Sequence, residues 1–399
     1  MLFTEYNLGP LRLRNRAIRA AAFEGMCPGN RVSDDLINYH ASVAAGGTAM
    51  TTVAYAAVTR NGLSFPHQLL VTKESVPDLR RLTDAIHREG AAASIQLGHC
   101  GLMADRRVAG TCLSPSGGFN LYGANFHRTA TVDEIREIAI EFGRAVAIAR
   151  EAGFDAVEIH AGHGYLISQF LSPYTNHRKD HYGGPLENRS RFMTEVMGKV
   201  MDNAGSGLAV VVKMNLRDGF KGGMELDESV EVARVLEKAG VHGLVLSGGF
   251  VSRAPMYVMR GKMPVQVMAH FIQNPFMRLS VACFAGLLIR PVPYREAYFL
   301  DDALEIRKEV NLPLILVGGL HSRDTIELVI EKGFSFIQMA RPLIQDPGFI
   351  GKLKRGEVSG SACNRANYCI AKMYTREMRC HQNESNLPSR WKERFAKES

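Results

Sequence analysis

The chain has 399 residues, of which 46% are hydrophobic and 22% are charged, as is usual for a globular protein with a sizeable core. Its 7 cysteines are too few for a disulfide scaffold, and its formal net charge of +8 is not gathered into one basic block, so we expect no nucleic-acid partner. The first residues lack the apolar core of a signal peptide, and no run reaches the roughly 18 apolar residues of a membrane span. These features predict a cytoplasmic protein.

Short apolar runs rich in Val, Ile and Ala alternate with longer amphipathic stretches. Eight such runs occur, at 17–23, 48–58, 91–97, 156–160, 208–214, 243–247, 314–318 and 334–339. Each run is followed by a segment whose apolar residues recur every three to four positions, as in a helix. Examples are 132–151, 188–203, 227–238 and 322–331. Several helices are predicted to stop at a glycine just before the next strand, at Gly90, Gly153, Gly240 and Gly333. Eight β-α units predict an α/β fold, a (β/α)8 TIM barrel. A doubly wound open sheet is the alternative, although no G-x-G-x-x-G turn follows any strand.

Two insertions interrupt this pattern within the barrel, which we expect to span residues 1–357. The segment 98–131 is a glycine-rich polar loop after the third strand. The segment 249–293 follows the sixth strand and contains Met256, Met259, Met263, Met268 and Met277. This Met-rich segment could line an adaptable apolar pocket or a partner surface, or form a subdomain with its own small core. Residues 358–399 form a cysteine-containing extension, whose tail at 389–399 has the pattern of an exposed helix or a frayed end.

Polar residues gather where the predicted strands end. TIM barrels place function at this C-terminal face of the barrel, so these residues are the candidates for a site. They are Gln96 after the third strand, His160, His163 and Tyr165 after the fourth, Lys213 after the fifth, Gly318 and Gly319 after the seventh, and Ala340 and Arg341 after the eighth.

The spacing H-x-x-H-x-Y at 160–165 is the sharpest of these features. Two neutral imidazoles can donate from Nε2 to one developing oxyanion, and the Tyr165 hydroxyl offers a proton. A zinc pair is the alternative, but zinc needs a third ligand and usually a nearby carboxylate base, and no H-E-x-x-H motif is present. Loops after the seventh and eighth strands often bind phosphate, which suits two glycines and the forked donors of Arg341.

Five segments together form a recognisable pattern: NRAI at 15–18, QLGHCG at 96–101, EIHAGHGYLISQFLSPYTNHRKDHYGGPLENRSRF at 158–192, VGG at 317–319 and ARPLIQDP at 340–347. These segments resemble the old yellow enzyme family, the FMN-dependent ene-reductases and their 2,4-dienoyl-CoA reductase relatives. They appear in the family's order and span about 330 residues, with the block at 158–192 the most specific.

The resemblance implies an FMN site built on the barrel. Gln96 would hydrogen-bond the pyrimidine part of the flavin, and Lys213 stands where the family usually has an arginine near N1 and O2. The phosphate would be held by Gly319, Ala340 and Arg341. The segment lying against the flavin would be Ala20, Ala21, Ala22 and Phe23, with Ala21 and Ala22 in place of the family's Pro-Met.

The resemblance also implies a reaction in two halves, in which NADH or NADPH reduces FMN and the flavin then gives hydride to an activated alkene. His160 and His163 would bind the carbonyl oxygen of a small-molecule substrate, and Tyr165 would protonate the α-carbon. A homo-oligomer is expected by the same likeness. Two other functions stay open: an amine dehydrogenase or demethylase, and a flavin-binding subunit without catalysis.

Cysteines near the C-terminal end resemble the cluster segment of the dienoyl-CoA reductase relatives. Cys363, Cys369 and Cys380 match thiolate positions, but Ala366 occupies a fourth. A 4Fe–4S cluster normally needs four thiolates, so the sequence predicts no cluster and no other metal.

Overall fold

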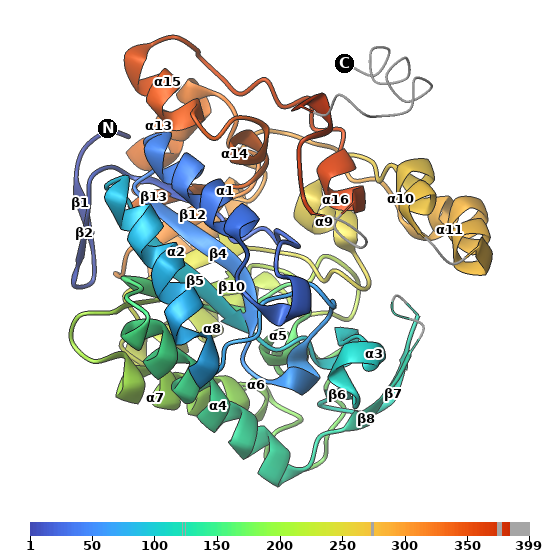
Figure 1. Cartoon of the computed structure of the whole chain (residues 1–399). Helices are drawn as coiled ribbons and strands as arrows, with labels where there is room; N and C mark the ends of the chain where they lie inside the picture. The colour runs from blue at the N-terminus through green and yellow to red at the C-terminus, as the bar shows by residue number, and fades with distance from the viewer. Residues whose placement is uncertain (122, 124, 273–274, 373–376, 384–399) are drawn as a thin grey trace.

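Eight parallel strands form a closed barrel in this computed structural model, which describes residues 1–121, 123, 125–272, 275–372 and 377–383 (Figure 1). Each strand pairs with its neighbours along the chain, and the last pairs with the first, so the TIM barrel is confirmed and the open sheet is wrong. Each of the eight predicted runs overlaps a barrel strand. The strands are β3 (Ala17–Arg19), β4 (Met50–Ala57), β5 (Ala92–Gly98), β9 (Ala156–Ala161), β10 (Ala209–Asn215), β11 (Gly243–Ser247), β12 (Leu314–Val317) and β13 (Phe336–Met339).

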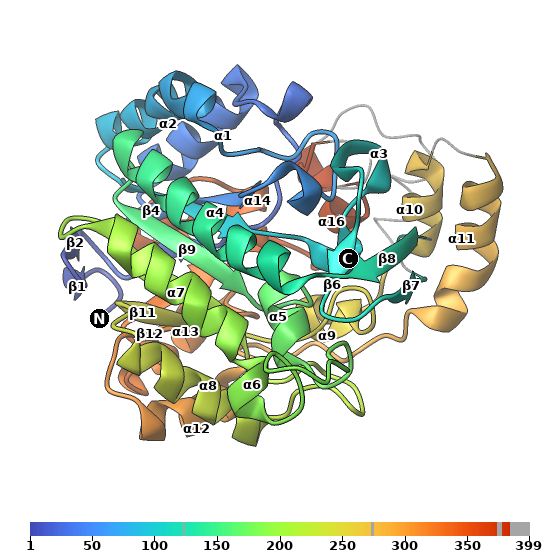
Figure 2. The same cartoon turned by 90° about the horizontal axis from the view of Figure 1, so that it is seen from below.

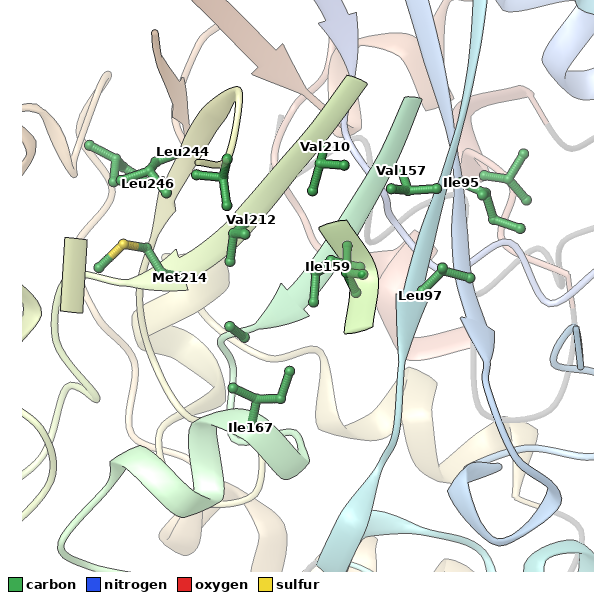
Figure 3. Close-up of a cluster of buried hydrophobic side chains, with 14 of the residues drawn as sticks. Ile95, Leu97, Val157, Ile159, Ile167, Val210, Val212, Met214, Leu244 and Leu246 are labelled. Atoms are coloured by element: carbon green, nitrogen blue, oxygen red, sulfur yellow. The ribbon is translucent and has the colours of Figure 1, made fainter. Parts of the chain in front are cut away.

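Burial on both faces explains why these strands are continuously apolar. Alternate residues such as Val157, Val210 and Leu244 pack outward against the surrounding helices in the main core (Figure 3). The residues between them face the barrel interior, where Ala156, Val211 and others form a second core. The alternation of side chains along each strand therefore produces two cores, one outside the barrel and one inside it.

Helices surround the barrel. Residues 132–151 form a helix as predicted, and it begins with a capping box in which the Thr131 and Glu134 side chains each accept a backbone N–H of the other residue. The predicted stop glycines all have φ between 70° and 94°, a conformation that favours glycine. The longer helices are α1 (Asp34–Ala45), α2 (Val76–Arg88), α4 (Val132–Glu151), α7 (Arg191–Ala204), α8 (Leu226–Lys238), α12 (Leu300–Glu309), α13 (Arg323–Glu331) and α15 (Phe349–Arg355). Short helices α5 (Leu166–Leu171), α6 (Leu186–Arg189) and α14 (Arg341–Gln345) follow strands or precede longer helices.

A hairpin that the sequence pattern does not predict covers the N-terminal end of the barrel. It consists of β1 (Tyr6–Leu8) and β2 (Leu11–Leu13), and its Leu8 and Leu13 side chains join the interior core. This end of the barrel is therefore filled by apolar side chains, which leaves the opposite end for a site.

The two insertions extend from the other end and lie on the same side of the molecule in both views (Figures 1 and 2). The first contains α3 (Arg106–Ala109) and a small sheet of β6 (Leu113–Ser114), β7 (Gly118–Asn120) and β8 (Asn125–Thr129). The Met-rich insertion contains α9 (Pro255–Met259), α10 (Val265–Phe271) and α11 (Pro275–Leu288). Met256 and Met263 are buried, while Met268 packs against the extension.

The C-terminal extension folds back toward the barrel. Its helix α16 (Tyr368–Lys372) packs on α10, and Cys369, Met378 and Cys380 pack against Ile344. The expected frayed tail at 389–399 lies outside the described residues. No helix in the described part of the chain has the length and apolar character to cross a bilayer.

Candidate active site

A cavity of about 220 Å³ opens at the C-terminal end of the barrel and brings most of the predicted site residues together. Gln96 and His160 are the exceptions, since both are buried without bordering it. The predicted residues that line the cavity are Ala20, Ala21, Ala22, Phe23, His163, Tyr165, Lys213, Gly318, Gly319, Ala340 and Arg341. Met259 also borders it, so one methionine of the Met-rich insertion contributes to the pocket.

The segment at 160–165 is held in place from both sides. His163 adopts a left-handed backbone conformation with φ 58°, which is uncommon for a residue other than glycine. Its N–H donates to Asn215 Oδ1 at 2.9 Å, and its carbonyl oxygen accepts from Val251 N–H at 3.0 Å. These bonds fix the turn to the end of β10 and to the loop after β11. The rings of His160 and Tyr165 consequently lie with their centroids 4.5 Å apart.

Both histidines are neutral, because burial lowers the pKa of His160 well below its usual value and lowers the pKa of His163 to about 3. The positive charge of Lys213 adds to both shifts. The two rings differ in their hydrogen bonds. Gly162 N–H donates to His160 Nδ1 at 3.4 Å, which places the proton of His160 on Nε2, whereas His163 Nε2 lies 2.7 Å from Ser247 Oγ. His160 thus keeps a donor, and Ser247 is a polar cavity residue that the sequence reading missed.

Tyr55 is a second missed neighbour of the proposed proton donor. Its ring centroid lies 4.9 Å from that of Tyr165, and its hydroxyl contacts Ser64 Oγ and lies 3.5 Å from Cys100 Sγ. Burial raises the pKa of Tyr55 well above its usual value, with further contributions from Cys100 and Tyr165. The Tyr55 hydroxyl therefore stays protonated beside Tyr165. An aromatic residue inside a buried strand looks like an ordinary core residue, so no sequence pattern marks Tyr55 as part of a site.

A buried polar layer crosses the barrel at the floor of the cavity. Lys213 Nζ lies 2.7 Å from Glu158 Oε1, and both side chains are buried. Gln96 Nε2 and Gln338 Nε2 each donate to Glu158 at 2.6 Å. Glu158 and Gln338 were not among the predicted residues. Their signal was available in the sequence, as polar residues at inward positions of otherwise apolar strands.

Arg341 gives the far end of the cavity a positive charge. Arg341 donates to Asn367 Oδ1 at 2.9 Å, and Asn367 in turn donates to the backbone carbonyl oxygens of Arg260 and Lys262. Burial, together with Arg341 and Arg365, lowers the pKa of His321 to about 4. Asn367, which lies in the C-terminal extension, therefore links Arg341, the predicted phosphate ligand, to the Met-rich insertion through hydrogen bonds.

Gly318 and Gly319 are required by packing as well as by backbone conformation. Their φ values are 110° and 74°. A Cβ atom on Gly318 would lie 2.7 Å from the Tyr298 ring, and one on Gly319 would lie 2.8 Å from the Ala297 nitrogen. This close approach lets the loop after β12 form part of the cavity wall.

Among the described residues, no group of three or more His, Cys, Asp or Glu side chains is arranged to hold a metal ion. The H-x-x-H pair and the three cysteines of the extension are therefore not part of such a group. Cys369 and Cys380 are buried beside Ile344, where desolvation raises the pKa of the Cys369 thiol to about 12.

A TIM barrel whose cavity has an arginine at one end, apolar residues along the 20–23 segment and polar residues at its floor suits a phosphorylated cofactor with a flat ring system. The model of the NADH:flavin oxidoreductase / NADH oxidase family matches residues 1–278. The chain is 40% identical over 378 residues to a 4,4'-dithiodibutanoate disulfide reductase of Rhodococcus erythropolis, covering 94% of this chain and 93% of that protein. It is 32% identical to a metal reductase of Desulforamulus reducens over 89% of this chain, but it spans only 49% of that relative.

The fold is also that of an old yellow enzyme homologue from Zymomonas mobilis, with a TM-score of 0.73 at 22% identity, covering 97% of this chain and 99% of the other. The chain belongs to the NADH:flavin oxidoreductase / NADH oxidase family. It is an FMN-dependent NAD(P)H oxidoreductase, which confirms the family, the enzyme class and the cofactors expected from the sequence.

Proposed function

We propose that this enzyme reduces the activated C=C bond of an α,β-unsaturated carbonyl compound, with electrons from NAD(P)H delivered through FMN. The observation that carries the proposal is the placement of Tyr165 and His163 on the cavity wall, with His160 packed against Tyr165. A proton donor next to neutral imidazoles is the arrangement that an enone needs, because its carbonyl gains negative charge as the alkene is reduced.

Residues along the cavity suit the different parts of FMN. Arg341 and the neighbouring His321 suit the phosphate at the basic end, and the 20–23 segment offers an apolar wall for the ring system. At the floor, Lys213 supplies a cation and Gln338 an acceptor: Gln338 Oε1 is buried and has no hydrogen-bond partner within the described residues. A buried polar atom without a partner in the protein is expected where a ligand completes the bond.

When bound, FMN supplies the hydride for the alkene after receiving it from NAD(P)H. His163 and Tyr165 line the cavity and would meet the substrate carbonyl there, while His160 packs behind them against Tyr165. Tyr165 gives its hydroxyl proton to the alkene carbon that does not receive the hydride. One hydride and one proton together saturate the double bond, and Tyr165 regains a proton from solvent.

Disulfide reduction is a second candidate. A specific observation favours it, namely 40% identity over nearly the whole of both chains to a protein named for reducing 4,4'-dithiodibutanoate. In that reaction one disulfide takes the two electrons of NAD(P)H and two protons, and two thiols leave. Such a substrate has no carbonyl at the reacting atoms, so it makes no use of the His160 and Tyr165 pair.

Separated half-reactions distinguish the two candidates. The FMN-loaded protein is bleached with NADH or NADPH without oxygen and then mixed with either cyclohexenone or 4,4'-dithiodibutanoate. The proposal expects flavin absorbance to return with cyclohexenone, with one cyclohexanone formed per flavin. Return of absorbance only with the disulfide, with two thiols formed, would replace the proposal by the second candidate. A flavin that neither compound reoxidises would contradict both.

A further inference from the structure

The two insertions of the barrel carry nearly all of the protein's net charge. Residues 98–131 contain three arginines and one aspartate, and residues 249–293 contain four arginines and one lysine with no acidic residue. Together they have a formal charge of +7, whereas the other 320 residues contribute only +1 to the total of +8. Both insertions lie on the same side of the molecule (Figures 1 and 2). This side of the protein therefore attracts anions.

The same two insertions expose large apolar side chains. The five most exposed of these side chains among the described residues all lie here, with exposed fractions between 59% and 85%. They are Leu121, Phe126, Phe276, Leu279 and Phe284. Exposed apolar residues that gather on one side of a protein mark a surface that binds a partner or a membrane.

Helix α11 contributes three of these residues because it is apolar on more than one face. It packs on α10, and its Ala285 is buried. Phe276, Leu279 and Phe284 are spaced so that they form one stripe along the exposed side of the helix. A helix that is apolar all round is normally buried all round. The exposed stripe of α11 is therefore expected to be covered when the protein acts.

We propose that this side of the protein binds the surface of a bilayer that contains anionic phospholipids, with the exposed stripe of α11 entering the interface. Helices that lie in a membrane surface combine phenylalanine and leucine, which enter the boundary of the acyl chains, with cations that attract anionic headgroups. Lys262, Arg278 and Arg290 are exposed cations of the same insertion. The 14 residues of α11 extend about 21 Å, which suits a helix lying along a bilayer rather than across its core of roughly 30 Å.

Charge favours this occupant over a second copy of the chain. An interface formed by the same face of two copies would bring two segments of charge +5 together, and like charges facing each other are unfavourable. An anionic bilayer instead supplies the opposite charge and an apolar layer at the same surface. The proposal concerns a surface outside the cavity and does not depend on the reaction proposed above.

The test is cosedimentation of the FMN-loaded protein with phosphatidylcholine vesicles that contain or lack phosphatidylglycerol. At low salt the protein should bind the vesicles with phosphatidylglycerol at least about tenfold more tightly, because each cation near an anionic surface adds to the attraction. Binding should weaken strongly at about 1 M salt, where the screening length is about 3 Å. Equal binding to the two kinds of vesicle, or binding to neither, would overturn the proposal.

Two pairs of variants locate the binding surface, and retained flavin absorbance shows that each variant is folded. F284S should weaken vesicle binding by about tenfold or more, since it removes an apolar side chain from the interface. L328S is its control, because Leu328 is an exposed leucine on α13, outside both insertions. R278E should also weaken binding, whereas K332E, which changes the net charge equally at an exposed position after α13, should not. Wild-type binding by F284S, or equal losses in R278E and K332E, would overturn the proposal.

Analytical ultracentrifugation without vesicles identifies the other occupant. A dimer that F284S dissociates, in a protein that binds no vesicles, would assign the stripe of α11 to a second copy of the chain and contradict the lipid proposal. A sedimentation coefficient that F284S leaves unchanged, together with vesicle binding that F284S weakens, is the result expected for a bilayer.

Discussion

Arg19 and Glu24 form an ion pair directly behind the segment that lines the cavity, with Arg19 Nη1 2.6 Å from Glu24 Oε1. Both side chains are buried. Arg19 also donates to the carbonyl oxygens of Ala22 at 2.7 Å and of Thr52 at 2.6 Å, and Glu24 accepts the backbone N–H of Ala54. The conformation of the 20–23 segment therefore depends on a charge pair that the cofactor never meets.

Removing one partner of the Arg19–Glu24 pair should lower the stability of the folded protein. R19M leaves the Glu24 carboxylate buried without its cation, and we expect the free energy of unfolding to fall by about 3–5 kcal/mol. Urea denaturation measures this value. R12M is the control, because the Arg12–Glu5 pair is exposed and should contribute about 0–1 kcal/mol. Similar losses in the two variants would show that the buried pair does not hold the segment.

A change at Tyr165 should slow the reduction of the enone but not the reduction of the flavin by NADPH. Y165F removes the proton donor and is expected to slow enone reduction by about 10²–10⁴-fold, the usual contribution of a general acid. Reduction of the flavin by NADPH, followed by stopped-flow absorbance, should stay close to the wild-type rate. Y6F, in the hairpin at the opposite end of the barrel, is the control and should change neither rate. Equal slowing of both halves in Y165F would refute the assigned role.

Buried histidines should make stability depend on pH. The pKa of His163 is about 3 in the folded protein, whereas an unfolded histidine titrates near 6.5. Between these values the unfolded chain binds more protons, so stability is complete above about pH 6.5 and falls as the pH is lowered, by up to about 1.4 kcal/mol per pH unit for each such histidine.

Urea denaturation between pH 6.5 and 5.0 checks this slope. H163N should show a shallower decline than wild-type protein, and asparagine tolerates the left-handed backbone at this position. Parallel pH profiles for the two proteins would mean that His163 titrates normally when folded.

Arg341 should discriminate a phosphorylated flavin from an unphosphorylated one. A charge-assisted hydrogen bond contributes about 1.5–3 kcal/mol, so R341A should weaken FMN binding by roughly 10- to 150-fold. Riboflavin, which lacks the phosphate, should bind R341A and wild-type protein alike. R355A removes an exposed arginine paired with Glu357 and is the control. Parallel losses for both flavins would place the phosphate elsewhere.

The barrel could be predicted because its strands are buried on both faces, so each appears as an apolar run ending at a turn. Most cavity residues followed from the same reasoning, since the ends of parallel strands meet at one rim. The β1–β2 hairpin was missed because strands of three residues carry too little periodicity to detect.

Two residues of the polar floor, Glu158 and Gln338, were missed for a different reason. Gln338 lies within an apolar run, and only its inward register on β13, beside the other inward polar residues, shows that it faces Glu158. The packing of Cys369 and Met378 against Ile344 depends on tertiary contacts that no local pattern encodes. Most cavity residues can thus be predicted from the ends of the strands, whereas their hydrogen-bond partners cannot.

The lining of the cavity begins at Ala20 and ends at Met378. During synthesis, Ala20 and its neighbours therefore leave the ribosome long before Met378 has been made. Asn367 must also emerge before Arg341 can be tied to the insertion. The complete lining of the cofactor site therefore cannot form until the chain has been made as far as Met378, after all eight strands of the barrel.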